Sequence, residues 1–434
     1  MTDLLLSGVT LPTGGAPADV LIGDGVIRRI ADHGAADPPP TAEVVDLAGH
    51  LLLPSAVETH AHLDKALLAG RAANPTGDLA GAIAANRAVY PTIDRRDIRD
   101  RATAALSTAV ARGFTLVRTH ANLEVGIGTE AVEALLEVAR EVADEVELEV
   151  VGLVGFPLTG EDGRDNRELL LRALELGLPV VGGAPALDPR PDEAVRWLVA
   201  AAADAGTPID LHLDETLDPD VLTLRTYARE VAARGLAGRA VASHCVSLGQ
   251  QDETVVAELA RMLADAGIAV VTLPQTNLLL QGRDRRTRLP RATPPVRALC
   301  EAGVTVAGGG DNWRDMFNPL GRIDPFETAA LLVAAAHLSP TEAYRSVSTD
   351  ARRALGRPEV DLRPGAPAEL LAVRADTLPD AVADASEERT VVHRGRVVSR
   401  TRVIRHGAAA GRARAGRAAE TTRPSPVPDP TAGR

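Results

Sequence analysis

Two histidines separated by one residue, His60 and His62, are the first candidates for chemistry in this 434-residue chain. They come at the end of a short run, 56–60, that predicts a β-strand. Residues i and i+2 of a strand share one face, so both imidazoles can bind the same cation. The chain has ten histidines, so an H-x-H pair also arises by chance. The pair therefore needs support from other parts of the chain.

Three further strand-like runs end in residues of the same chemical kind. One ends in His212 and is followed closely by Glu215, another ends in His244, and a third is followed by Asp311. The carboxyl ends of parallel barrel strands meet at one rim, where catalytic groups of such folds are found. The predicted metal ligands are His60, His62, His212 and Asp311.

Neutral imidazoles with one carboxylate suit Zn(II) or Fe(II), and a catalytic site leaves one coordination position open to water. The ion lowers the pKa of that water, which then attacks an sp2 carbon as hydroxide. Glu215, three residues after His212, is placed to carry protons from the water to a leaving nitrogen. His244 is expected to orient the hydroxide or to stabilise developing charge. Asp311, Glu215 and His244 are thus the predicted catalytic residues.

The middle of the chain must position these groups. There, apolar runs rich in β-branched residues alternate with longer segments of helical period, a pattern typical of βα units around a parallel sheet. Eight such runs favour a closed (β/α)8 TIM barrel over an open doubly wound sheet. The predicted strands are 56–60, 115–120, 148–154, 179–182, 208–213, 240–244, 269–273 and 304–308, and the clearest predicted helices are 95–112, 130–143, 192–205 and 252–266.

Both ends of the chain have a different texture, in which short β-rich runs are separated by turns. We expect residues 1–54 and 364–405 to pair into one small β-sandwich-like domain, with the metal-dependent barrel at 55–363. Residues 406–434 are rich in Ala, Gly and Arg, then in Pro, and hold few large apolar side chains. Such a composition predicts a disordered tail.

Charge and composition exclude several classes of function. The net charge of −12 repels phosphate backbones, and no basic stripe offsets it, so nucleic acid is not an expected partner. The N-terminus lacks the features of a signal peptide and no apolar run approaches about 18 residues, which predicts a cytoplasmic protein without a membrane span. The two cysteines, Cys245 and Cys300, form no C-x-x-C pair, so neither a disulfide framework nor a thiolate zinc site is expected.

A few residues near the predicted ligands are candidates for supporting roles. Lys65 is the only lysine in an arginine-rich chain, which suggests a site that needs an amine. It can pair with Asp64 or Asp311, or contact an anionic or carbonyl group of the substrate. Trp313 and Phe317 can line the pocket over a flat ring, with plain packing as the alternative. For His120, a supporting or core role is favoured over that of a ligand.

These motifs and their order resemble the bacterial cytosine deaminases and their relatives in the amidohydrolase superfamily. The similarity runs from about Asp19 to Val398 and includes the segments 117–120, 280–283 and 318–321. The resemblance implies one divalent ion per chain, iron or zinc, on the four predicted ligands, with Glu215 and His244 assisting proton transfer and hydroxide attack. Many dinuclear relatives have a bridging lysine on strand four, where this chain has Gly182-Gly183-Ala184-Pro185, and the resemblance therefore favours one metal.

Departures from this family concern the substrate. Where cytosine deaminases have a glutamine that reads the pyrimidine edge, this chain has Leu158, which cannot make those hydrogen bonds. Asn312 replaces an aspartate beside the metal ligand. Together with His62-Leu63-Asp64-Lys65, these differences are more similar to the N-isopropylammelide amidohydrolase branch, whose members remove an alkylamine from a triazine. The predicted substrate contacts are Lys65, Leu158, Asn312, Trp313 and Phe317.

We therefore expect hydrolysis of a C–N bond on a small six-membered N-heterocycle of the pyrimidine or triazine kind. Hydrolysis of a cyclic or linear amide, or removal of an alkylamine, uses the same groups and is the alternative reaction. A catalytically inactive binding scaffold is a third interpretation. It predicts the loss of a ligand or of the proton shuttle, and neither is lost. The relatives also favour a homo-oligomer.

Overall fold

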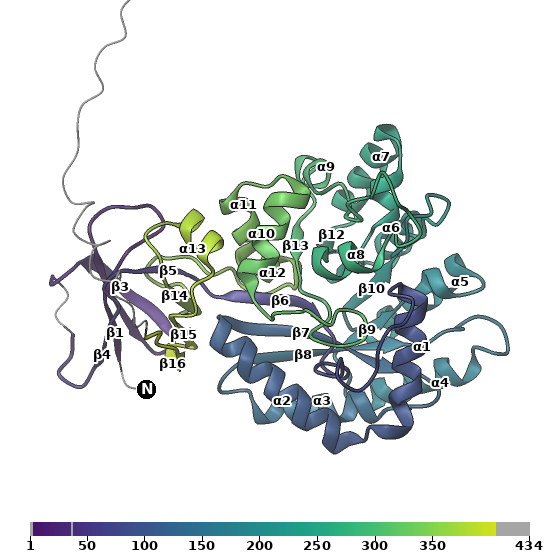
Figure 1. The fold of residues 1–434 in the computed structure, drawn as a ribbon, viewed down its shortest axis with the longest axis horizontal. Coiled ribbons are helices and arrows are strands. Elements are labelled where there is room, and N and C mark those ends of the chain that lie inside the picture. Colours follow the sequence, from purple (N-terminus) through teal and green to yellow (C-terminus); the bar gives the residue numbers. More distant parts are fainter. Residues whose placement is uncertain (1–2, 36–37, 405–434) are drawn as a thin grey trace, which may run out of the picture. The chain divides into compact units, whose positions relative to one another are not determined.

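Eight parallel strands form the central barrel of the computed structural model, which describes residues 3–35 and 38–404 (Figure 1). Sheet order follows chain order, and the first and last strands approach through a parallel bridge between Ala61 and Asp311. The barrel prediction is confirmed. Its strands are β6 (Ala56–Ala61), β7 (Phe114–Leu123), β8 (Glu147–Val154), β9 (Val180–Gly183), β10 (Ile209–Leu213), β11 (Ala240–His244), β12 (Ile268–Thr272) and β13 (Val306–Gly308).

The strands are buried almost throughout because helices cover the outside of the barrel and side chains fill its inside. The four helices that the sequence predicted most clearly are present within two residues of their expected ends: α2 (Arg95–Arg112), α3 (Glu130–Glu141), α5 (Pro191–Ala205) and α7 (Glu253–Asp265). The other helices are α4 (Arg164–Glu175), α6 (Leu224–Ala233), α8 (Pro274–Leu280), α9 (Val296–Glu301), α10 (Pro325–Ala336), α11 (Pro340–Ser346), α12 (Thr349–Ala354) and α13 (Leu378–Asp384).

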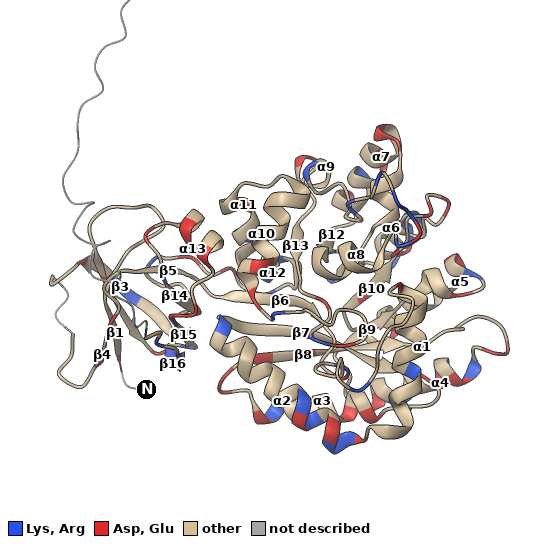
Figure 2. Ribbon diagram, in the orientation of Figure 1, with Lys and Arg blue, Asp and Glu red and all other residues tan. Residues whose placement is uncertain are grey.

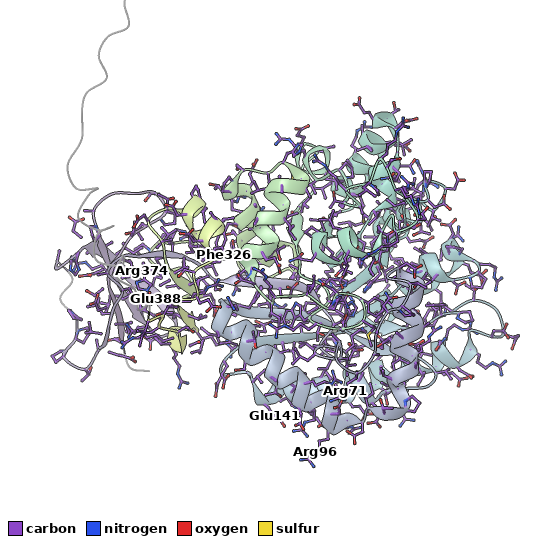
Figure 3. All side chains as sticks on the ribbon, viewed as in Figure 1. Arg71, Arg96, Glu141, Phe326, Arg374 and Glu388 are labelled. Carbon is purple, nitrogen blue, oxygen red and sulfur yellow. The ribbon has the colours of Figure 1, made fainter. Side chains whose placement is uncertain are left out.

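Helix α2 shows how local signals fix an element. The Asp94 side chain accepts a hydrogen bond from the Asp97 N–H at its start, and Gly113, with a φ of 106°, ends it in the left-handed region. Charged residues lie on the solvent side of α2 and α3 (Figure 2), where Arg95 pairs with three glutamates of α3. Arg96 projects from α2 into solvent, whereas Phe326 of α10 is buried (Figure 3).

Helix α1 (Leu79–Val89) stands apart from the helices that cover the barrel. This helix and the 3-10 turn Tyr90–Thr92 lie between β6 and α2. The Asp78 side chain caps α1 by accepting from the Gly81 N–H at 2.8 Å. This excursion separates the first barrel strand from its covering helix and brings new side chains to the rim of the barrel.

Both chain ends contribute to a second apolar core beside the barrel. One four-stranded sheet has the order β3-β2-β1-β4, and another has the order β16-β15-β14-β5. Strand β5, which precedes the barrel, pairs with β14, which follows it, so the predicted pairing of the two ends is present. The boundaries at 54/55 and 363/364 stay a prediction. The strands are β1 (Leu4–Val9), β2 (Ala18–Gly23), β3 (Val26–Asp32), β4 (Glu43–Asp46), β5 (His50–Pro54), β14 (Leu370–Arg374), β15 (Arg389–His393) and β16 (Arg396–Arg400).

Two further expectations concern membrane-spanning helices and the C-terminal tail. No helix among the described residues is long and apolar enough to cross a membrane. The predicted disordered tail, 406–434, lies outside the described residues.

Candidate active site

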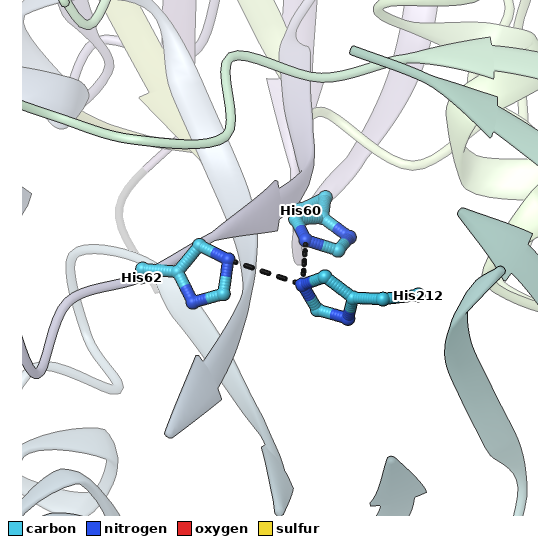
Figure 4. A group of neighbouring side chains, drawn as sticks. All are labelled: His60, His62 and His212. Carbon is cyan, nitrogen blue, oxygen red and sulfur yellow. Dashed lines mark hydrogen bonds between the residues drawn. The ribbon is translucent and has the colours of Figure 1, made fainter. Parts of the chain in front are cut away.

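The ring nitrogens of three histidines converge inside the barrel, at the carboxyl ends of β6 and β10 (Figure 4). The Nε2 atom of His212 lies 3.0 Å from Nε2 of His60 and 3.3 Å from Nε2 of His62. Asp311, just after β13, adds its Oδ1 atom 3.2 Å from His62 Nε2 and 3.9 Å from His60 Nε2. The four predicted ligands therefore meet at one point, although they come from three parts of the chain.

This donor set fits a divalent ion. Two nitrogens that each lie about 2.1 Å from one tetrahedral ion are roughly 3.4 Å apart, close to the observed separations. Burial lowers the pKa of His60, His62 and His212 well below the ordinary value, which keeps the imidazoles neutral. Neutral imidazole is the form that binds metal.

A buried chain of hydrogen bonds sets the tautomer of His60. Its Nδ1 lies 3.0 Å from the Ser243 hydroxyl, which itself donates to Asp210 at 2.8 Å. Because the hydroxyl proton is used on Asp210, Nδ1 of His60 must be the donor, and Nε2 presents a lone pair to the other ligands. Asp210 also accepts from Arg118 at 3.0 Å, and Arg118 pairs with Glu149. These hydrogen bonds thus hold the predicted ligand His60 from behind.

Glu215 lies two residues after β10 and His244 is the last residue of β11, and both line the inner cavity. Glu215 Oε1 lies 3.6 Å from His244 Nδ1, and the same nitrogen lies 3.0 Å from the Asn277 side-chain oxygen. Burial, with Asp311 adding to it, raises the pKa of Glu215 well above its ordinary value. A carboxyl with a raised pKa can exchange protons near neutrality, as a general acid/base requires.

The backbone is unusual at these strand ends. Asp214, His244 and Asp311 have φ values of 52°, 71° and 63°, in the left-handed region that non-glycine residues rarely adopt. Such conformations cluster at functional sites, where the surrounding structure holds them. Here they turn the chain directly after β10, β11 and β13, so that functional side chains face the barrel mouth.

Three of the four predicted ligands, His62, His212 and Asp311, line an inner cavity of about 90 Å³ that adjoins an outer cavity of about 1150 Å³. Leu79, Ile83, Arg87 and Phe156 belong to the walls of both cavities. The predicted contacts Lys65, Asn312 and Phe317 line the inner cavity. That they touch a substrate stays a prediction.

Two predicted substrate contacts do not line either cavity. The Leu158 side chain is buried, and its N–H donates to the Asp188 carboxylate, so that Phe156, two residues earlier, forms the wall instead. Trp313 is buried beside Phe114, with ring centroids 6.3 Å apart. For Trp313, plain packing is the alternative that the geometry favours. The sequence shows which residues follow a strand end, but not which of their side chains points into the cavity.

Lys65 and His120 lie immediately behind the ligands. The Lys65 ammonium is 3.2 Å from Asp64 Oδ1 and 2.9 Å from His62 Nδ1, a nitrogen that also lies 3.1 Å from the His120 carbonyl. His62 Nδ1 therefore faces both a donor and an acceptor and serves one of them at a time. The His120 ring stacks on His60 with centroids 3.8 Å apart.

His60, His120 and Asp210 form a second group that could hold an ion. It shares His60 with the first group, and its carboxylate already accepts from Arg118 and Ser243. The first group, with Asp311 added, is therefore the better metal site. A supporting position for His120 agrees with the sequence interpretation.

The wall that α1 and β7 contribute was missed entirely. Arg87 of α1 pairs with Glu124, directly after β7, at 2.7 Å, and Glu124 also accepts from the Tyr90 hydroxyl at 2.5 Å. Arg87 and Glu124 both line the inner cavity. No motif marks these residues in the sequence, since an Arg and a Glu 37 positions apart carry no spacing signal.

Comparison with known proteins places the chain in a family. Residues 68–399 match the model of the amidohydrolase family. The chain belongs to this family. This amidohydrolase is 35% identical over 395 residues to a pterin deaminase of Rhizobium rhizogenes, with 88% of each chain covered. It is 23% identical over 422 residues to the N-isopropylammelide isopropyl amidohydrolase of a Pseudomonas species, covering 93% of this chain and 98% of the relative.

Solved structures agree with the sequence relatives. The 5-methylcytosine deaminase of Klebsiella pneumoniae, liganded with 5-fluorocytosine, superposes with a TM-score of 0.84 at 29% identity, over 93% of this amidohydrolase and 99% of that chain. The N-isopropylammelide isopropylaminohydrolase of Burkholderia multivorans gives 0.80 at 29%, over 92% and 99%. The predicted family, fold and class of reaction are confirmed: this amidohydrolase is a hydrolase of C–N bonds, and its histidine cluster could hold a metal ion.

Proposed function

We propose that this amidohydrolase deaminates a small N-heterocycle, with a 2-amino-4-oxo ring of the pterin or pyrimidine kind as the first candidate. The observation that carries the proposal is the convergence of His60, His62, His212 and Asp311 at one point beside a cavity that Glu215 also lines. The choice of ring follows the 35% identity to a pterin deaminase. The inner cavity with its outer extension leaves room for a second ring or a substituent.

We further propose one divalent ion per chain, zinc or iron, held by the three histidines and Asp311. When bound there, the ion would supply Lewis-acid activation of a water molecule. A single ion is favoured because β9 (Val180–Gly183) presents no lysine that could bridge two metals. A homo-oligomer stays a prediction from the resemblance.

The side chains have distinct tasks in this reaction. Water adds its oxygen to the ring carbon, the bond from that carbon to the amino nitrogen breaks, and ammonia leaves. Glu215 accepts one proton from the attacking water and delivers it to the leaving nitrogen, while the second proton stays on the ring as a lactam N–H. His244 donates its Nδ1–H to the Asn277 side-chain oxygen, and burial lowers its pKa, so the neutral ring presents Nε2 as an acceptor that orients the attacking water. Phe156 and Phe317 provide apolar walls for a flat ring.

Removal of an alkylamine is the second candidate. It is supported by the fold and the 29% identity shared with the Burkholderia N-isopropylammelide isopropylaminohydrolase. It is also supported by apolar side chains in the walls of both cavities, Leu79, Ile83 and Leu187. Such side chains can pack against an alkyl group, whereas release of ammonia does not need them. The two reactions share every metal ligand and differ only in the amine released.

The test begins with the metal content of the purified protein, followed by product analysis with the same sample. Pterin, isocytosine, cytosine, ammeline and N-isopropylammelide are incubated with the metal-loaded protein, and ammonia and isopropylamine are quantified. We expect about one equivalent of zinc or iron and ammonia release from an amino-oxo ring. Isopropylamine alone would favour the second candidate, and a protein that binds no metal even after reconstitution would refute the mechanism.

A further inference from the structure

Arg87 stands where the inner and outer cavities meet, and its side chain is held in place on two sides. Its Nε and Nη2 atoms donate to one oxygen of Glu124, at 3.1 and 2.7 Å. Its guanidinium carbon lies 4.7 Å from the centre of the Phe156 ring, a distance typical of cation–π stacking. Although α1 is a surface helix, this side chain is therefore oriented before any ligand arrives.

Glu124 is itself fully occupied, which fixes the orientation of Arg87 further. The Tyr90 hydroxyl donates to its second oxygen at 2.5 Å, and the Asn122 amide approaches the same atom at 3.3 Å. Tyr90 in turn accepts from Asn86 at 3.0 Å. The Glu124 side chain is only 9% exposed. A buried carboxylate with four donors has no capacity left for a substrate, so it serves to position the arginine.

The arginine, in contrast, has donors left over. A guanidinium carries five N–H groups in a planar fork, and Glu124 takes two of them. Among residues 3–35 and 38–404, no hydrogen-bond partner is found for Nη1, and the side chain is 41% exposed toward the cavities it lines. A planar, oriented fork with free N–H groups is the geometry that recognises a carbonyl or a carboxylate.

We propose that Arg87 determines substrate specificity by donating hydrogen bonds to an oxygen acceptor on the heterocycle, a ring carbonyl or a carboxylate substituent, with Glu124 as its positioning residue. The inference rests on the proposed function. A ring whose amino carbon lies beside Glu215 presents its other edges to the remaining walls, and Arg87 is on one of them. Arg87 therefore recognises the oxygen-bearing edge of the ring. Leu158 cannot do so, because its side chain has no hydrogen-bonding group and is buried away from the cavity.

The alternative is that Arg87 only ties α1 to β7. An ion pair of this exposure contributes at most about 1 kcal/mol to stability, and Tyr90 and Asn86 already connect the segment after β6 to Glu124. A purely structural role predicts a changed melting temperature and no change in substrate preference. The two roles therefore have different signatures.

The test compares wild type with Arg87→Met, which keeps an apolar stem over Phe156 but removes the donors. Dissociation constants are measured for pterin, 6-carboxypterin and 2-aminopteridine, which lacks the ring oxygen. Arg190→Met is the matched control: Arg190 belongs to the same rim of the barrel, pairs with Glu193 and lines neither cavity.

In wild type we expect the oxygen-bearing rings to bind more tightly than 2-aminopteridine. In Arg87→Met this preference falls by roughly 10- to 100-fold, the size of a lost hydrogen bond to a charged group. Arg87→Lys, a point charge without the fork, restores the preference only in part. In Arg190→Met the preference stays as in wild type. Loss of preference for pterin identifies the ring carbonyl as the acceptor, and loss for 6-carboxypterin alone identifies the carboxylate.

An equal preference in Arg87→Met and wild type overturns the inference, as does a wild-type protein that binds all three rings equally or none of them. Because binding is measured apart from turnover, a failure of the proposed function can be distinguished from a failure of the role of Arg87. A metal-loaded protein that prefers oxygen-bearing rings but releases no ammonia from any of them would refute deamination while supporting the role of Arg87.

Discussion

The two walls of the inner cavity are built in different ways. The metal wall consists of side chains at the ends of β6, β10, β11 and β13, and its members are buried and held by hydrogen bonds from inside the barrel, as Ser243 and Asp210 hold His60. The recognition wall consists of Arg87 on α1, Glu124 after β7 and Phe156 after β8. Arg87 and Phe156 are partly exposed while Glu124 is buried, and the wall includes a helix that the barrel pattern does not require.

The difference suggests a division of labour. Barrel strands fix atoms to within a fraction of an ångström, as metal chemistry requires, whereas a helix in a connecting segment can vary without disturbing the barrel. We expect changes in the metal wall to affect metal affinity and kcat, and changes in the recognition wall to affect KM and substrate preference. Four predictions test this separation, from the largest expected effect to the smallest.

Replacement of Glu215 by Gln is expected to have the largest effect. The amide keeps the shape of the side chain but cannot accept a proton from the attacking water, so kcat falls by roughly 10²- to 10⁴-fold. Metal content, measured by elemental analysis, is expected to stay as in wild type because Glu215 is not among the ligands. Turnover at the wild-type rate would mean that another group moves the proton.

Replacement of Ser243 by Ala tests the support behind the metal wall. It removes the acceptor of the His60 Nδ1–H and leaves Asp210 without one of its donors. We expect a metal affinity weaker by roughly 10- to 100-fold, measured by competition with a chromophoric chelator. Ser247→Ala is the control, since its hydroxyl donates to the Val221 carbonyl and not to the site. An unchanged affinity in Ser243→Ala would show that packing alone orients His60.

Replacement of Glu124 by Gln tests the recognition wall. The variant keeps the size of the side chain but loses the charge that holds Arg87, so the arginine is free to adopt other conformations. We expect KM for the oxygen-bearing ring to rise by roughly 3- to 10-fold with little loss of bound metal. Steady-state kinetics and elemental analysis on one sample measure both. If metal content fell along with binding, the two walls would not be separable.

Replacement of Asp315 by Asn is expected to have the smallest effect on the reaction, since it changes the pH dependence of stability and not the chemistry. Asp315 accepts from the Asn312 amide and from the N–H groups of Phe317 and Asn318, and burial raises its pKa to about 7. Between about pH 4 and pH 7 the folded protein therefore keeps a proton that the unfolded chain releases. The protonated Asp315 carboxyl therefore contributes fully to the free energy of unfolding below about pH 4. This contribution is lost as the pH rises to about 7, by up to about 1.4 kcal/mol per pH unit.

Urea unfolding of wild type and Asp315→Asn across this range measures the difference. The variant is expected to lose less stability than wild type as the pH rises from 4 to 7, because its amide does not titrate. If stability depended on pH in the same way in both proteins, Asp315 would not be the group that titrates in this range. A change of KM in the variant would show that the loop after β13 also shapes the cavity, which would blur the boundary between the walls.

The metal wall could be predicted from the sequence for a physical reason. A strand has a period of two and a barrel has one rim for all carboxyl ends, so His60, His62, His212 and Asp311 converge once the strands are identified. Each strand carried its own local signal, a β-branched apolar run between turns. Helix α2 was predicted from its helical period, and its ends also carry local signals, a capping aspartate and a left-handed glycine.

Only the tertiary structure decided the recognition wall. Arg87 and Glu124 meet because the segment after β6 forms α1 beside β7, and no short-range pattern encodes that meeting. Leu158 was expected in the cavity and is buried instead, while Phe156 lines the wall, because the turn after β8 sets the direction of each side chain. The sequence by itself determined the barrel, the family resemblance and the convergence of the four predicted ligands, since these follow from local periodicity and from one shared rim. What the cavity recognises depends on loops and a helix whose positions arise from long-range packing alone.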